Sequence, residues 1–167
     1  MGRWRAPQPA SSPYITPAGY EALQDELRGL WERRTDVVKA LSAAAAEGDR
    51  SENAEYIYRK KELGGIDRRI RYLQKRLPDL NIVRKTPGDD KADNKVFFGA
   101  WVTLERDDGS TVDYRIVGAD EADAASDSIS MDSPLARAVL KRQVDDEIEL
   151  MIEKRREHFL IKGVRYE

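Results

Sequence analysis

Two acidic residues, Asp49 and Glu52, stand three positions apart in the polar stretch GDRSEN at residues 48–53. Paired carboxylates suit Mg²⁺, a hard cation that takes oxygen ligands and keeps several of its waters. Two acids are too few for a tight site, so we expect an ion that is shared with another macromolecule. The alternative is structural: Asp49 is then the N-cap of a helix, and Glu52 completes a capping box and favours the helix dipole. Spacing alone favours this structural alternative.

Two long helices are predicted to flank these acids. The first has Thr16 as its N-cap and Pro17 at its first helical position, and the second ends near Pro78. Gly48 is expected to end the first helix in a left-handed conformation, with Asp49 or Ser51 capping the second. Apolar residues recur in steps of three, four and seven, which is typical of a coiled-coil seam. The two seams are Tyr20, Leu23, Leu27, Leu30, Val37, Leu41 and Ala44, and Tyr56, Leu63, Ile66, Ile70, Leu73, Leu77 and Leu80.

Because the link between the helices is short, they must be antiparallel neighbours, and residues 14–83 are predicted to form one coiled-coil domain. Thirty residues at about 1.5 Å each make a rod of roughly 45 Å, with residues 48–53 at its far tip. Nothing structural demands a tip so far from the body, so this geometry favours the metal interpretation of the acids. Gly64 and Gly65 interrupt the second helix, which predicts a weak point or a close helix approach.

The second half of the chain changes to the two-residue period of strands. A polar linker at 84–95 leads to predicted strands at 96–105, 111–117, 129–131, 147–152 and 159–165, the last two forming a hairpin around 153–157. Ser133 and Pro134 open a short helix at 135–140. Residues 96–167 therefore read as a small α+β domain, and the proline-containing residues 1–13 as a disordered extension. The fold class expected for the whole chain is α+β.

Composition narrows the functional classes. The chain has no cysteine, which excludes disulfides and thiolate metal sites and agrees with a reducing, cytoplasmic setting. No apolar run approaches a membrane span, and the start lacks a secretory signal. His158 is the single histidine and is expected to be structural or exposed, so a zinc site is not predicted. Phe97, Phe98 and Trp101, taken as one strand, suggest stacking on nucleic acid, but a core or docking role is favoured.

Charge is divided unevenly along the chain. Residues 1–95 carry a net charge of +4 and residues 96–167 a net charge of −6. In the second helix, basic residues recur opposite the apolar seam and form a basic stripe, which can attract phosphates without base specificity. A solvated helix face is the plainer alternative. The residues of this basic stripe are Arg59, Lys60, Lys61, Arg68, Arg69, Arg71, Lys75 and Arg76.

Four separated motifs carry a resemblance to a known family. GDRSENAEYIYRKK at 48–61 resembles the tip signature of the bacterial Gre transcript-cleavage factors, which are transcription elongation factors. DRRIRYLQKRL at 67–77, KVFFGAWV at 95–102 and ISMDSPLARA at 129–138 resemble the GreB branch in particular. The similarity runs from about Tyr14 to Tyr166. Three residues depart from the family pattern: Gly64 and Gly65 replace good helix formers, and Asp145 replaces a glycine in a turn.

The resemblance implies a function. The coiled coil would enter the secondary channel of RNA polymerase, where Asp49 and Glu52 would help hold a catalytic Mg²⁺ that the free protein does not bind stably. Ser51, Asn53 and Tyr56 would be supporting tip residues, and the basic stripe would contact the 3′ segment of backtracked RNA. The C-terminal domain would be FKBP-like and dock on the polymerase. The chain would then be a monomeric activator of RNA cleavage by polymerase, not an enzyme itself, with no membrane partner.

Three alternatives remain open on sequence grounds. A channel-binding paralogue that inhibits polymerase would share the fold and differ at the tip. A prolyl isomerase would need an apolar proline pocket, which likeness of fold alone does not supply. A coiled-coil scaffold without chemistry would leave the acidic tip unexplained.

Overall fold

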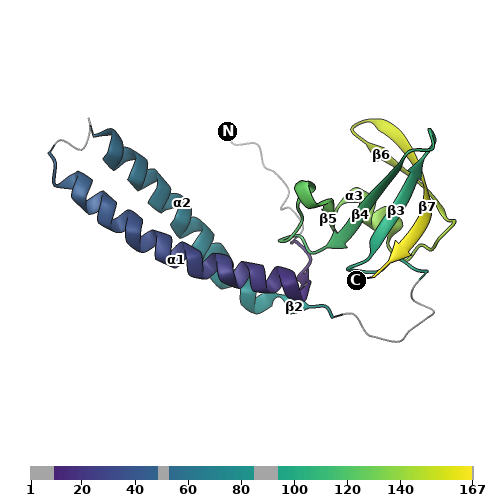
Figure 1. The fold of residues 1–167 in the computed structure, drawn as a ribbon, viewed down its shortest axis with the longest axis horizontal. Coiled ribbons are helices and arrows are strands. Elements are labelled where there is room, and N and C mark those ends of the chain that lie inside the picture. The colour runs from purple at the N-terminus through teal and green to yellow at the C-terminus, as the bar shows by residue number, and fades with distance from the viewer. Residues whose placement is uncertain (1–9, 49–52, 85–93, 167) are drawn as a thin grey trace, which may run out of the picture. The chain divides into compact units, whose positions relative to one another are not determined.

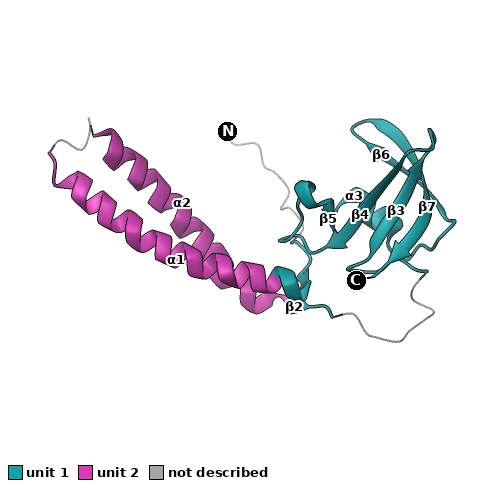
Figure 2. Ribbon diagram, viewed as in Figure 1, with its two compact units in different colours: residues 1–19, 81–167 teal, residues 20–80 magenta. Residues whose placement is uncertain are grey.

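The computed structural model describes residues 10–48, 53–84 and 94–166 and divides the chain into two compact units. Residues 20–80 form a helical unit, and residues 1–19 with 81–167 form a second unit built on a β-sheet (Figure 2). The predicted α+β class is confirmed, with long N-terminal helices followed by a sheet domain (Figure 1). No helix within the described residues has the length and apolar character needed to cross a bilayer.

The helical unit is an antiparallel pair. Helix α1 (Pro17–Ala45) starts in the sheet unit, helix α2 (Ala54–Arg76) returns beside it, and the 3-10 turn η1 (Leu77–Asp79) follows. Val37 of α1 is fully buried against Ile66 and Ile70 of α2, as the predicted seams require. Leu27, Leu30 and Leu63 pack around these three side chains.

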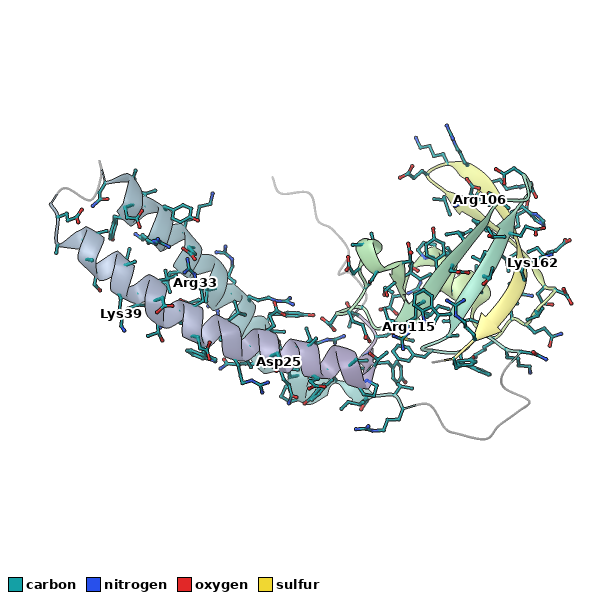
Figure 3. The ribbon with its side chains drawn as sticks, in the orientation of Figure 1. Asp25, Arg33, Lys39, Arg106, Arg115 and Lys162 are labelled. Atoms are coloured by element: carbon teal, nitrogen blue, oxygen red, sulfur yellow. The ribbon has the colours of Figure 1, made fainter. Side chains whose placement is uncertain are left out.

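Ion pairs between the helices confirm their antiparallel direction. Arg33 Nη2 of α1 lies 2.6 Å from Glu62 Oε1 of α2, and Arg33 can be followed beside α2 in Figure 3. Glu26 lies seven residues before Arg33 in α1 and pairs with Arg69, which lies seven residues after Glu62 in α2. Arg34 stands between Leu30 and Val37, where the α1 seam has a gap of seven residues. Its Nε donates to Asp67 Oδ1 at 2.7 Å. An arginine is tolerated at the seam because its aliphatic stem packs and its head reaches an acid across the helix pair.

The sheet unit contains five strands in the order β5-β4-β3-β7-β6. Their bounds are β3 Trp101–Arg106, β4 Thr111–Val117, β5 Ser128–Ser130, β6 Glu147–Ile152 and β7 Arg155–Arg165. β5 runs parallel to β4, and the other neighbours are antiparallel. Helix α3 (Pro134–Val139) supplies Ala136 and Val139 to the core, and Ser133 caps it by accepting from Ala136 N at 3.2 Å, as predicted.

Side-chain alternation along β3 defines the two faces of the sheet. Val102 and Leu104 are 1% exposed and pack in the core with Ile116, Phe159 and Ile161. The intervening β3 residues therefore point to the opposite face.

A two-stranded parallel pair, absent from the predictions, joins distant segments. Strand β1 (Tyr14–Ile15) pairs with β2 (Asn81–Ile82). Just before β1, Ser12 donates its N–H to Asp132 Oδ2 at 2.8 Å and its hydroxyl to Oδ1 at 2.5 Å. The described part of the predicted disordered extension is therefore hydrogen-bonded to the sheet unit, because its polar groups find partners far away in sequence.

Several predicted element bounds were wrong. The strand predicted at 96–105 begins only at Trp101, because the chain turns at Gly99, which has φ of +87°. The predicted loop at 153–157 is a two-residue turn, with Glu153 and Lys154 both at positive φ, so β7 starts earlier than expected. A short 3-10 turn η2 (Ala124–Ser126) was not predicted. Gly64 and Gly65 make no close helix approach, since an added Cβ would meet only Arg68 within 4 Å.

Candidate tip and nucleic-acid interface

Asn53 holds together the two helix ends that flank the acidic stretch. Its side-chain oxygen accepts from Tyr56 N at 3.0 Å, so it is the N-cap of α2. Its Nδ2 donates to the carbonyl of Ala44, in the last turn of α1, at 2.8 Å. Gly48 follows α1 with φ of +122°, a backbone conformation that glycine adopts readily. One side chain thus satisfies a donor at the start of one helix and an acceptor at the end of the other.

This geometry corrects the capping prediction. Neither Asp49 nor Ser51 caps α2, because Asn53 does so and the helix begins at Ala54. Asp49, Ser51 and Glu52 lie outside the described residues. Asn53, predicted as a supporting tip residue, is described, and so is the half-buried Tyr56, whose ring centroid lies 6.0 Å from Lys60 Nζ.

Five members of the basic stripe are exposed, which agrees with a phosphate-binding face and equally with a solvated helix face. Among the described residues, none of these five has an ion-pair partner within 4.0 Å. They are Lys60, Lys61, Arg68, Arg71 and Lys75. Arg68 lies along the helix over the glycine pair, with its Nη1 3.5 Å from the position that a Cβ on Gly64 would occupy.

Arg59 and Arg69 depart from the predicted stripe. Arg59 donates to Glu55 at 2.8 Å and to Glu62 at 3.0 Å, and these hydrogen bonds raise the pKa of its guanidinium. Arg69 reaches across to α1 and makes a bidentate pair with Glu26, at 2.8 and 2.9 Å. Both are half-buried, as is Arg76, so Arg69 lies at the helix interface and not opposite the seam. The charges of Arg59 and Arg69 are paired with protein carboxylates.

Arg33 and Arg59 meet on one carboxylate. Arg33 donates from Nε to Glu62 Oε1 at 2.8 Å, and Arg59 donates to Oε2 of the same side chain. The hydrogen bond from Arg33, followed by that from Arg59, holds the pKa of Glu62 below its ordinary value. Glu62 therefore keeps its charge and connects both helices near the tip.

Two exposed tyrosines on α2 were missed by the sequence reasoning. Tyr58 is 61% exposed and Tyr72 is 42% exposed. The signal was available, because the two residues are fourteen positions apart, which is two heptads, and each has a basic residue three positions later.

In the sheet unit, Glu121 fastens the start of α1. Its Oε2 accepts from Thr16 N at 2.8 Å and from Gly118 N at 3.0 Å, and its Oε1 accepts from the Thr16 hydroxyl at 2.5 Å. Thr16 Oγ1 in turn accepts from Gly19 N at 3.0 Å, which confirms Thr16 as the N-cap of α1. Gly118 is required here because an added Cβ would stand 2.1 Å from Tyr14 O.

The aromatic residues predicted to share one strand do not do so. Only Trp101 lies in β3, on the face opposite Val102, and Arg165 Cζ is 5.0 Å from its ring centroid. Phe97 is 41% exposed, while the ring of Phe98 lies 6.4 Å from that of Tyr14. These three side chains form no common stacking surface.

His158 lies in β7 between two acids. Its Nδ1 is 2.7 Å from Asp107 Oδ1, and its Nε2 is 3.6 Å from Glu147 Oε2. The hydrogen bond with Asp107 is the main reason that its pKa is raised. Within the part of the chain that the structure describes, no three His, Asp or Glu side chains are grouped as metal ligands would be.

Comparison with known proteins identifies the family. Residues 13–82 match the model "Transcription elongation factor, N-terminal", and residues 91–166 match "Transcription elongation factor, GreA/GreB, C-term". Transcription elongation factor GreB of Xanthomonas axonopodis pv. citri is 55% identical over 99% of this chain and 98% of its own length. GreB of Pseudomonas aeruginosa is 54% identical over 89% of this chain and 87% of its own. The solved structure of Thermus aquaticus Gfh1 is 26% identical, covers 93% of this chain and 99% of its own, and has a TM-score of 0.42. The chain belongs to the GreA/GreB family of transcription elongation factors.

Proposed function

We propose that this chain inserts its helical unit into the secondary channel of bacterial RNA polymerase and stimulates Mg²⁺-dependent cleavage of the 3′ end of backtracked RNA. Such cleavage would rescue arrested complexes. The observation that carries the proposal is that Asn53 is the N-cap of α2. Asp49 and Glu52 are therefore not needed to start the helix. Their two carboxylates, which have no required capping role, can then serve as metal ligands.

The donor set fits Mg²⁺, because two carboxylates offer the hard oxygen ligands that this ion prefers. Asp49 and Glu52 would hold Mg²⁺ together with polymerase, and the bound ion would supply the positive charge needed to activate water and stabilise the leaving oxygen. Asp49 and Glu52 contribute ligands and orient water. The hydrogen bond from Asn53 to Ala44 O, at 2.8 Å, joins the two helix ends that flank these acids in the sequence. This chain is therefore an activator, and polymerase supplies the remaining ligands.

The exposed part of the basic stripe suits the displaced RNA. Five cations along α2 have their charge uncompensated by described carboxylates, and phosphate contacts require no particular base. The sheet unit would dock on the polymerase surface. Docking turns insertion of the helical unit into an intramolecular step, which raises its effective concentration.

A backtracked elongation complex, Mg²⁺ and the full chain provide the test. Wild-type protein should shorten the RNA, and the isosteric variants Asp49→Asn and Glu52→Gln should abolish this at saturating protein while polymerase binding persists. Slowed elongation without RNA shortening would instead identify an inhibitor. Continued cleavage by the double variant would reject the metal-ligand role of the two acids.

A further inference from the structure

Two tyrosines, Tyr58 and Tyr72, stand two heptads apart on α2 and define an aromatic row. Gly65 occupies the heptad position midway between them. Lys61, Arg68 and Lys75 follow these residues at a spacing of three and define a basic row beside it. Residues three apart on a helix are surface neighbours, so the two rows run in parallel along one face. Both tyrosines and all three cations are exposed.

Each tyrosine is supported by an arginine that is itself anchored. Arg59 Cζ lies 5.5 Å from the Tyr58 ring centroid, and its guanidinium is held by Glu55 and Glu62. Arg69 Cζ lies 5.2 Å from the Tyr72 ring centroid, and its guanidinium is held by Glu26. A cation close to an aromatic ring attracts it, so the two arginines restrain the rings. Each ring therefore has a carboxylate-bound guanidinium beside it, although Arg59 is held within α2 and Arg69 is held by α1.

The middle position of the row carries a different planar group. Gly65 has no side chain, and Arg68 Nη2 lies 3.8 Å from the position that its Cβ would occupy, with Nη1 3.5 Å from that of Gly64. The glycine pair leaves room for the guanidinium to lie against the helix. A guanidinium plane, like a tyrosine ring, can stack on a nucleobase.

We propose that Tyr58, Arg68 and Tyr72 stack bases of the displaced single-stranded RNA, while Lys61 and Lys75 of the basic row contact its phosphates. This proposal rests on the proposed function. At about 1.5 Å per residue, the two rings lie about 21 Å apart along the helix axis, a span of several nucleotides. Rings beside cations favour single-stranded nucleic acid, because every base has a stacking face and every nucleotide a phosphate. Arg59 and Arg69 are positioning residues for the rings and do not bind phosphate.

The test uses backtracked complexes with two kinds of long displaced RNA: one normal, and one abasic, which keeps the phosphates and lacks the bases. A third complex carries a displaced segment too short to reach either Tyr58 or Tyr72. The double variant Tyr58→Ala, Tyr72→Ala should lose about fivefold or more in apparent affinity per ring on the normal long RNA. It should match wild type on the abasic and short complexes, and phenylalanine at both positions should preserve wild-type behaviour.

Ile57→Ala is the matched control, because Ile57 is 53% exposed and adjacent to Tyr58 but is not aromatic. It should leave all three complexes unchanged. Equal losses by the tyrosine variant on normal and abasic RNA would overturn the proposal and place the rings against polymerase protein.

Binding of labelled single-stranded RNA to the free chain, followed by fluorescence anisotropy, separates this proposal from the cleavage function. Wild type should bind normal RNA more tightly than abasic RNA, and the double tyrosine variant, which keeps only Arg68 for stacking, should lose most of that preference. Equal binding by wild type would overturn base stacking even if cleavage is observed. If the free chain prefers normal RNA but no cleavage is observed, the cleavage function is rejected and base stacking by the aromatic row is supported.

Discussion

Asn53 Nδ2 donates a hydrogen bond of 2.8 Å to the carbonyl of Ala44 and so clasps the end of α1 to the start of α2. Asn53→Ala removes this bond and the N-cap of α2, which should lower the free energy of unfolding by about 1–2 kcal/mol. Asn53→Asp keeps an N-cap acceptor but loses the donor to Ala44, so its stability should fall between those of wild type and Asn53→Ala. Urea denaturation measures the order. If Asn53→Asp is as stable as wild type, the hydrogen bond from Asn53 to Ala44 O contributes nothing beyond capping.

Removing the carboxylate of Glu121 should destabilise the sheet unit. Thr16 is 5% exposed, and its N–H and hydroxyl both donate to this carboxylate. Glu121→Ala leaves these buried donors unsatisfied, at a cost of about 2–3 kcal/mol. Glu121→Gln retains one oxygen acceptor and should cost clearly less. Thermal unfolding of the full chain compares them, and equal losses for the two variants would contradict a hydrogen-bonding role.

Alanine in place of the α2 glycines should stabilise the helical unit. Gly64→Ala and Gly65→Ala should each gain about 1 kcal/mol, because the added Cβ makes only ordinary contact with Arg68. Gly29→Ala is the control in α1, where an added Cβ meets nothing within 4 Å, and it should gain as much. Gly118→Ala should instead destabilise, since its Cβ would clash with Tyr14 O. Chemical denaturation gives the four values; a loss at Gly64 or Gly65 would reveal a packing role for the glycines.

Asp145→Gly should stabilise the turn before β6. Asp145 has φ of +74°, a conformation that glycine adopts without steric cost. Its N–H donates to Ile161 O at 2.8 Å, and glycine keeps that bond. We expect a gain of about 0.5–1 kcal/mol in the free energy of unfolding. Asp146→Gly, which removes the acceptor for Gln143 N, should destabilise; a gain there as well would mean that the effect is not specific to positive φ.

The His158 cluster should make stability depend on pH. The raised pKa of His158, caused first by Asp107 and then by Glu147, means that the folded state favours the protonated ring. The stabilisation is complete below the unfolded-state pKa of about 6.5 and is lost as pH rises through the higher folded pKa. The stability difference between wild type and His158→Gln should therefore be larger near pH 6, below the unfolded-state pKa, than in clearly alkaline solution. Unfolding measured across this range checks the sign, and a pH-independent difference would exclude the charged pair.

Local patterns in the sequence determined the long helices and the starts of α1 and α3. Thr16–Pro17 and Ser133–Pro134 each fixed a helix start, because a cap and a proline act on the nearest backbone groups only. The seven-residue apolar repeats determined which faces of α1 and α2 are buried, because residues seven apart lie on the same face of a helix. The glycine expected at position 145 was replaced by aspartate, yet the backbone there kept positive φ. The motifs at 48–61 and 129–138 were also sufficient to identify the family.

Only the tertiary structure decided which polar groups meet. The β1–β2 pair, the contact of Glu121 with Thr16 and the contact of Ser12 with Asp132 join residues far apart in sequence, which no local period encodes. Arg69 belongs to the basic stripe on a helical wheel, but its long side chain reaches Glu26 on the neighbouring helix. A helical wheel shows only the direction of each side chain around one helix. It does not show which acids of a second helix come within hydrogen-bonding distance. For the same reason, the choice of Asn53 over Asp49 as the cap depended on the nearby carbonyl of Ala44.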